Sequence, residues 1–92
     1  MTTDLLTMTR VTVTATSATL ATLLGAALST GLSKLTLVPA SSGIYWNTGD
    51  AATASTPPLP ETGVELEIGK ASADLVQFYA ASDIDMDVYQ EG

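Results

Sequence analysis

Apolar and polar residues alternate in several short stretches of the chain. A period of two is typical of β-strands that bury one face, and it differs from the period of an amphipathic helix. The stretches that show it, or that are short and rich in aromatic and β-branched residues, are 10–15, 32–38, 44–47, 64–68, 75–80 and 84–89. We therefore predict about six short strands, of which the second is stopped by Pro39.

One segment has helical spacing instead. Its leucines fall at i, i+3, i+4 and i+8, which places them on a single apolar stripe: Leu20, Leu23, Leu24 and Leu28. Ser17 is the predicted N-cap, and Gly31 is the predicted left-handed residue that ends the helix. Gly25 lies inside this helix at a cost of about 1 kcal/mol relative to alanine. We therefore expect one short helix held by packing.

The remaining pattern sets the fold class. Residues 50–60 form a long loop of Thr, Ala, Ser and Pro, whose prolines favour extended geometry. Residues 1–9 show no clear period and are interpreted as an N-terminal arm, followed by a single β-sandwich domain over 10–92. The predicted fold is all-β and mainly antiparallel, a small β-sandwich or jelly-roll-like barrel of about six strands with one short inserted helix.

Composition narrows the function. A chain of 92 residues buries a modest core, and this one has neither Cys nor His, so disulfides, thiolate zinc sites and histidine chemistry are absent. No serine can act in a triad without histidine, and the sequence has no glycine-rich phosphate loop. We therefore predict no enzyme activity and no cofactor, and expect stability to come from association with a partner.

Charge is distributed unevenly. The net charge is −7, and residues 49–92 hold nine acids with Lys70 as the sole base. Such a chain cannot neutralise phosphates, so we predict no binding to nucleic acid. The uncharged stretch between Arg10 and Lys34 is long enough to cross a bilayer, but 9 of its 23 residues are Thr or Ser, so we predict no membrane span.

Two groups of acids suggest chemistry. Asp83, Asp85 and Asp87 resemble the start of a calcium loop, but Val88 stands where an EF-hand needs glycine. We interpret this segment as an edge strand whose outward charges block strand association, with a weak cation site shared with Glu91 or a neighbouring subunit as the alternative.

The pair Glu65 and Glu67 has the spacing of a catalytic carboxylate pair on one strand face. No apolar pocket that would raise one pKa is evident from the sequence. We therefore expect both side chains to face solvent.

Adjacent Tyr45 and Trp46 must point to opposite faces of a strand. Trp46 is predicted to pack under the proline-rich loop, or alternatively to anchor an interface. The chain has three basic residues, Arg10, Lys34 and Lys70, and at least one of them is expected to form an inter-subunit salt bridge. The candidate interface residues are Leu5, Leu6, Met8, Arg10, Tyr45, Trp46, Lys34 and Lys70.

Residues 10–92 also carry a series of short motifs. They are Thr19-Leu20-Ala21-Thr22-Leu23-Leu24-Gly25-Ala26-Ala27-Leu28, Ile44-Tyr45-Trp46, Ala51-Ala52-Thr53-Ala54-Ser55, Pro58-Leu59 and Gly63-x-x-Leu66. In this order they resemble small structural proteins encoded in the virion-morphogenesis region of tailed bacteriophages.

The resemblance implies a β-sandwich component of the virion. Specifically, it implies a head decoration or cement protein that binds the major capsid protein on the capsid surface, as a homo-oligomer with a trimer favoured. Two alternatives stay open, a neck, tail or fibre component and a host-surface carbohydrate-binding module that uses Tyr45 and Trp46.

Overall fold

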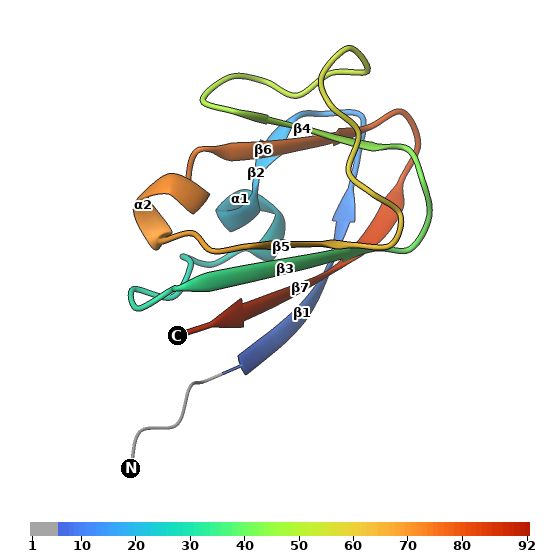
Figure 1. Cartoon of the computed structure of the whole chain (residues 1–92). Helices are drawn as coiled ribbons and strands as arrows, with labels where there is room; N and C mark the ends of the chain where they lie inside the picture. The colour runs from blue at the N-terminus through green and yellow to red at the C-terminus, as the bar shows by residue number, and fades with distance from the viewer. Residues whose placement is uncertain (1–5) are drawn as a thin grey trace.

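The computed structural model describes residues 6–92, which form two antiparallel β-sheets packed as two layers with two short helices (Figure 1). The larger sheet has the strand order β1-β7-β3-β5, and the smaller sheet has the order β2-β6-β4. The elements are β1 (Leu6–Val13), β2 (Ala18–Thr19), α1 (Leu20–Leu24), β3 (Lys34–Pro39), β4 (Ile44–Thr48), β5 (Val64–Leu66), α2 (Lys70–Ala73), β6 (Val76–Ala80) and β7 (Ile84–Glu91). The predicted all-β, mainly antiparallel fold is confirmed, but the two sheets remain separate and do not close into a barrel.

The hydrophobic core lies between the sheets and is built from alternate residues of their strands. The larger sheet contributes Val11, Val13, Leu35, Leu37, Met86 and Val88, and the smaller sheet contributes Ile44, Val76, Phe78 and Ala80. All of these are at most 4% exposed, and no polar side chain between residues 8 and 92 is buried with them. The period of two in the sequence thus corresponds directly to the inner faces of the two layers.

The first strand begins earlier than the sequence pattern suggests. Residues 6–9, which were expected to belong to an arm, are part of β1. Their partner β7 is also eight residues long, and the register from Leu6 opposite Glu91 to Val13 opposite Ile84 pairs both strands over their full length. Ladder pairing therefore extends β1 beyond its regular apolar alternation.

The inserted helix α1 is shorter than predicted. Its N-cap is Thr19, whose hydroxyl accepts a hydrogen bond from the Thr22 N–H, and it ends at Gly25 in the left-handed conformation (φ 71°). The N–H of Ala26 donates to the carbonyl of Ala21 across this end, as in a Schellman motif. The predicted caps Ser17 and Gly31 are therefore wrong, because a glycine after only five helical residues offers an earlier stop.

Helix α1 contacts β1, β2 and β6, so it links the two sheets. A second short helix, α2, lies between β5 and β6, whereas the sequence predicted only one helix. Residues 6–92 therefore form two short helices and seven strands, one of which, β2, has only two residues.

The long loop after β4 is attached to the smaller sheet. The Trp46 N–H donates to the Pro57 carbonyl at 3.0 Å, and the Leu59 N–H donates to the Ile44 carbonyl at 2.7 Å. Tyr45 and Pro58 form an isolated antiparallel bridge between these two bonds. The proline-rich segment is therefore extended, as predicted, and it runs along the free edge of β4.

The same loop also crosses the outer face of this sheet. The Ala51 carbonyl accepts a hydrogen bond from the Asn47 side chain on β4, while the Ala52 N–H donates to the Ser17 hydroxyl beside β2. Strands β4 and β2 form opposite edges of the smaller sheet. The loop thus covers one end of the outer face of the smaller sheet.

Candidate interaction surface

The outer face of the larger sheet brings together polar side chains from both ends of the chain. The register of β1 and β7 places Arg10 opposite Asp87 and Thr12 opposite Asp85. Their neighbours Val11 and Met86 are buried, so alternation turns these four side chains away from the core. Cross-strand pairing between distant segments therefore creates a polar cluster that neither strand has alone.

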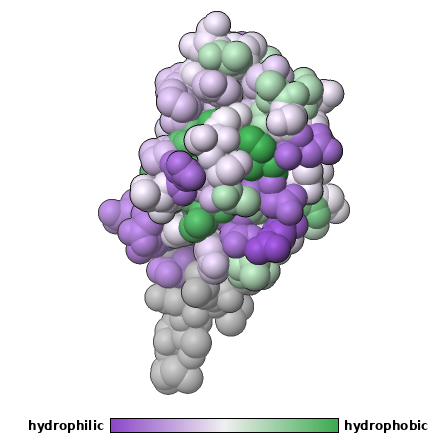
Figure 2. All heavy atoms as spheres, turned by 90° about the vertical axis from the view of Figure 1, so that its right-hand side faces the viewer, coloured by the Kyte–Doolittle hydropathy of each residue, from purple (hydrophilic) through white to green (hydrophobic). Residues whose placement is uncertain are grey.

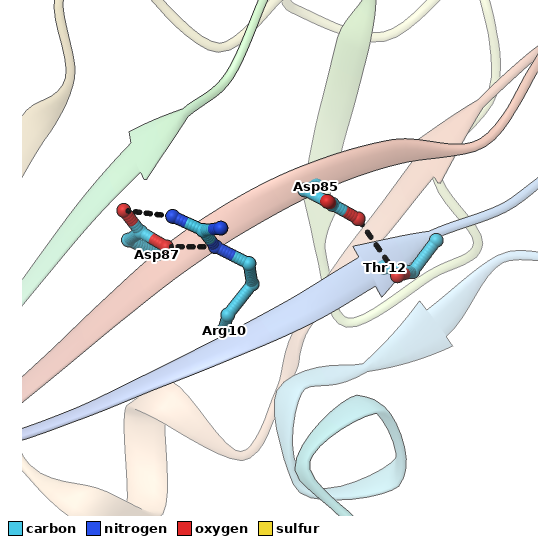
Figure 3. A network of polar contacts seen from close by, with 4 residues as sticks. All are labelled: Arg10, Thr12, Asp85 and Asp87. Carbon is cyan, nitrogen blue, oxygen red and sulfur yellow. Dashed lines mark hydrogen bonds and ion pairs between the residues drawn. The ribbon is translucent and has the colours of Figure 1, made fainter.

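The cluster is held by three hydrogen bonds (Figure 3). The Arg10 guanidinium donates from Nε to Asp87 Oδ1 at 2.8 Å and from Nη2 to Oδ2 at 3.4 Å. The Thr12 hydroxyl donates to Asp85 Oδ1 at 2.9 Å. The Arg10 side chain is 64% exposed, so solvent screens this pair and its main effect is to orient the two side chains.

The contact changes the acid–base behaviour of both partners. The hydrogen bond from Arg10 holds the pKa of Asp87 below its ordinary value, and Asp87 raises the pKa of Arg10. A carboxyl group with a lowered folded-state pKa adds stability above its unfolded pKa, and that stability is lost as the pH falls through the folded value.

We therefore expect Asp87→Asn to remove a small part of the loss of stability in acid. Urea unfolding of the wild type and the variant, from neutral to strongly acidic pH, measures this difference. Arg10→Gln should give the same change, because it removes the donor that lowers the Asp87 pKa, and the double variant should add nothing further. Additive effects of the two substitutions would contradict the pairing.

A surface hollow of about 220 Å³ adjoins this cluster. It is lined by Arg10, Val38, Pro39, Ala40, Asp85 and Asp87. One side is polar and the other is apolar, and its polar groups are already oriented by β1 and β7. The hollow therefore brings charged groups of β1 and β7 together with apolar groups of β3 and the residue after it.

The position of β7 corrects one prediction. The segment with Asp83, Asp85 and Asp87 was expected to form an edge strand, but β7 lies in the interior of the larger sheet between β1 and β3. Its carboxylates therefore do not protect a sheet edge from pairing. Asp85 and Asp87 instead accept hydrogen bonds from side chains of β1. In the part of the chain that the structure describes, no three carboxylates cluster closely enough to hold a metal ion.

Three of the predicted interface residues precede Arg10 in the chain, and two of them, Leu6 and Met8, belong to β1. Met8 is 52% exposed and stands opposite Tyr89. Leu6 is the first residue of β1, and Leu5 lies outside the described residues. Figure 2 shows the side that faces right in Figure 1, where small apolar areas are separated by hydrophilic side chains. Met8 is therefore an exposed apolar side chain two residues before Arg10 on β1, on the same face of the strand.

The other two cations also have partners in their own chain. Lys34 on β3 approaches Glu65 on β5 with an N–O distance of 3.4 Å. Lys70 pairs with Asp74 at 2.7 Å, one helical turn later. The inter-subunit salt bridge expected from the sequence would have to compete with these pairs, and it stays a prediction.

Tyr45 and Trp46 point to opposite faces of β4, as the alternation predicted. Trp46 is partly buried and packs against the core opposite Phe78. Tyr45 stands opposite Tyr79 on β6, with ring centroids 6.4 Å apart and an angle of 42° between the rings. Tyr45 and Trp46 therefore cannot form one flat aromatic platform, whereas Tyr45 and Tyr79 lie side by side.

The paired glutamates are exposed, as expected, and Glu65 takes part in the ion pair with Lys34. Three residues were not anticipated, namely Thr12 and Val38 on this surface and Tyr79 on the smaller sheet. Thr12 and Asp85 are 73 positions apart in the sequence, so only the β1–β7 pairing reveals their contact. Tyr79 alternates with buried residues of β6, and that alternation was the available signal.

Comparison of the chain with models of known protein families, with curated proteins and with solved structures gave no match. None of the helices formed by residues 6–92 has the length and apolar character needed to cross a membrane.

Proposed function

We propose that this chain is a structural protein of a tailed-bacteriophage virion, a decoration or cement protein that binds the major capsid protein on the outer head lattice and stabilises it. In this role it carries out no catalysis, holds no cofactor, and binds neither nucleic acid nor membrane. It acts on the capsid surface as a homo-oligomer.

The observation that carries this proposal is that the phage-like motifs coincide with elements that the fold requires. Gly25 in the leucine-rich motif ends α1 with a φ of 71°, and Gly63 precedes β5 with a φ of 96°. Pro58 and Leu59 pair with β4, which contains the Ile44-Tyr45-Trp46 motif. The motifs on which the resemblance rests therefore include residues with defined backbone roles, and this is the support that the proposal draws from the fold.

The outer face of the larger sheet is the contact surface that we propose for the capsid. It combines the exposed Met8, the oriented pair Arg10 and Asp87, and the adjoining hollow on a hydrogen-bonded sheet. Non-obligate protein interfaces are about as apolar as the rest of a protein surface, so a surface with both polar and apolar groups is compatible with this role. The acidic second half of the chain would keep unassembled copies soluble.

Co-sedimentation of the purified protein with phage heads that lack it tests this proposal. We expect the wild type to sediment with the heads and Val38→Asp to lose binding, because a third carboxylate would enter the hollow beside Asp85 and Asp87. Tyr45→Ser, on the opposite sheet, is the matched control and should bind normally. Equal binding of all three proteins, or binding by none of them, would contradict the proposed surface.

A carbohydrate-binding role is the second candidate, and the pairing of Tyr45 with Tyr79 is the observation that favours it. In that case Tyr45→Ser would lose affinity for bacterial surface polysaccharide while Val38→Asp would retain it. The two candidates therefore predict opposite results for the same pair of variants.

A further inference from the structure

The four edges of the two sheets are protected to very different degrees. In the smaller sheet, β2 has only two residues, and the edge of β4 is covered by residues 57–59, where two prolines lack an N–H. In the larger sheet, β5 has three residues, whereas β1 has eight. Strand β1 is therefore the one long edge among the described strands that is paired with no other segment of residues 6–92 on its outer side.

The hydrogen-bond pattern shows which backbone groups of β1 point outward. The Ala40 N–H donates to the Asp85 carbonyl, in register with the β3–β7 ladder, so the odd-numbered residues of β7 bond to β3. In an antiparallel strand the even-numbered residues then bond to the other neighbour, which is β1. The register of β1 and β7 pairs the even-numbered residues of β7 with the odd-numbered residues of β1.

The N–H and C=O groups of the even-numbered residues of β1 must therefore face away from β7. An independent contact agrees with this parity, since the carbonyl of Thr14 accepts a hydrogen bond from the Ala80 N–H in the other sheet. Before that point, the outward groups belong to Leu6, Met8, Arg10 and Thr12. They form a regular row of donors and acceptors.

The usual devices that prevent an edge from pairing are missing from β1. The strand Leu6–Val13 contains no proline or glycine, and its only charge is Arg10. The guanidinium of Arg10 is bound across its own sheet by Asp87 instead of projecting along the edge. An edge of this kind is suited to strand addition.

We propose that β1 pairs antiparallel with β1 of a second copy across a two-fold axis, so that the two four-stranded sheets become one continuous sheet. The outward row of β1 is self-complementary, because under a two-fold axis the N–H and C=O groups of one copy face the C=O and N–H groups of the same strand in the other copy. The whole chain has a net charge of −7, but β1 contains one base and no acid. Two copies thus meet along a strand that itself carries no carboxylate.

The outward groups also specify the register. Thr9 faces Thr9 of the partner subunit in a non-hydrogen-bonded pair. On one side of this pair, the backbone of Met8 exchanges hydrogen bonds with Arg10 of the partner subunit. On the other side, the backbone of Arg10 does the same with Met8 of the partner subunit. This alignment uses the strand from Leu6 to Thr12 and places two threonines together, a favourable cross-strand pair. Centring the axis on Arg10 would place two like charges about 5 Å apart, so that register is disfavoured.

This inference does not depend on the proposed function, because it concerns the protein alone in solution. It also departs from the trimer that the sequence resemblance favours, since a strand that pairs with itself gives a closed two-fold dimer. Failure to bind phage heads would leave it intact, and a protein that is monomeric in solution would leave capsid binding intact, with its copies then associating only on the lattice.

Sedimentation equilibrium of the wild type and two variants provides the first test. We expect the wild type to have twice the 9.4 kDa chain mass, Met8→Pro to be monomeric, and Met8→Ala to remain dimeric. Proline removes an outward N–H and leaves the bonds to β7 in place, whereas alanine removes only the side chain. Circular dichroism verifies that each variant is folded. A monomeric or trimeric wild type, or a folded Met8→Pro dimer, would overturn the proposal.

Single cysteines test the register, because the natural chain has none. Thr9→Cys should form an intermolecular disulfide under mild oxidation, since self-opposed residues bring their Cα atoms within bridging range. Met8→Cys is the control: its side chain is more exposed, but its Cα would be more than about 7 Å from its own copy, beyond bridging range. Cross-linking of Met8→Cys alone, of both variants equally, or of neither would overturn the proposed register.

Discussion

Replacing Phe78 by alanine is expected to lower the free energy of unfolding by about 3–5 kcal/mol. Phe78 is fully buried on the inner face of β6, among the core residues that join the two sheets. A small domain has only about 5–15 kcal/mol of total stability. Loss of this ring therefore removes a large fraction of it, and urea unfolding followed by circular dichroism measures the change.

The adjacent residue is the matched control. Tyr79 lies on the opposite face of β6, where its ring pairs with Tyr45. Its replacement by alanine should cost about 0.5–1.5 kcal/mol for the lost aromatic pair. If Tyr79→Ala destabilised the protein as much as Phe78→Ala, the assignment of inner and outer faces would be wrong.

Replacing Gly63 by alanine is the second substitution with a large expected effect. Gly63 has a φ of 96°, and an added Cβ would lie 3.0 Å from the Leu37 carbonyl oxygen and 3.3 Å from Val38 Cγ2. The backbone conformation alone costs a residue other than glycine about 1–3 kcal/mol. The close approach to β3 adds to this, because a backbone carbonyl within a sheet cannot move aside easily.

Gly49→Ala separates these two contributions. Gly49 has a similar φ of 86°, but an added Cβ would meet nothing within 4 Å. We expect both variants to be less stable than the wild type in urea, and Gly63→Ala to be clearly the less stable of the two. Equal losses would mean that β5 and its preceding turn do not pack against β3 as described.

The alternation of apolar residues was sufficient to predict most strands. Residues 76–80 and 84–91 show why, since every second side chain on each is buried or turned toward the core. Alternation depends on local geometry, which the sequence records directly. The same signal placed Tyr45 and Trp46 on opposite faces.

Strand order could not be predicted in this way. β7 has the alternating charges of an edge strand, but it lies inside the sheet, because both β1 and β3 can pair with it over most of its length. Asp85 and Asp87 remain tolerable there because Thr12 and Arg10 donate to them. Long-range pairing decides this question, and no local pattern encodes it.

Helix boundaries failed for a different reason. The leucine stripe predicts that the helix continues across Gly25. In the structure Gly25 instead ends the helix as a left-handed C-cap, a conformation that glycine adopts without steric cost. The sequence predicted only part of the candidate surface, because that surface also depends on long-range strand pairing. Arg10 and Met8 were recognised as possible contacts, whereas the hollow depends on a neighbour, Val38, brought in by β3.

Counting the copies of this chain per particle, by quantitative mass analysis of purified virus, tests the central claim most directly. A decoration protein must be present in a fixed ratio to the major capsid protein across the whole head lattice, and this is the result we predict. A copy number that matches a single ring at the neck or tail, or absence from the particle, would contradict it.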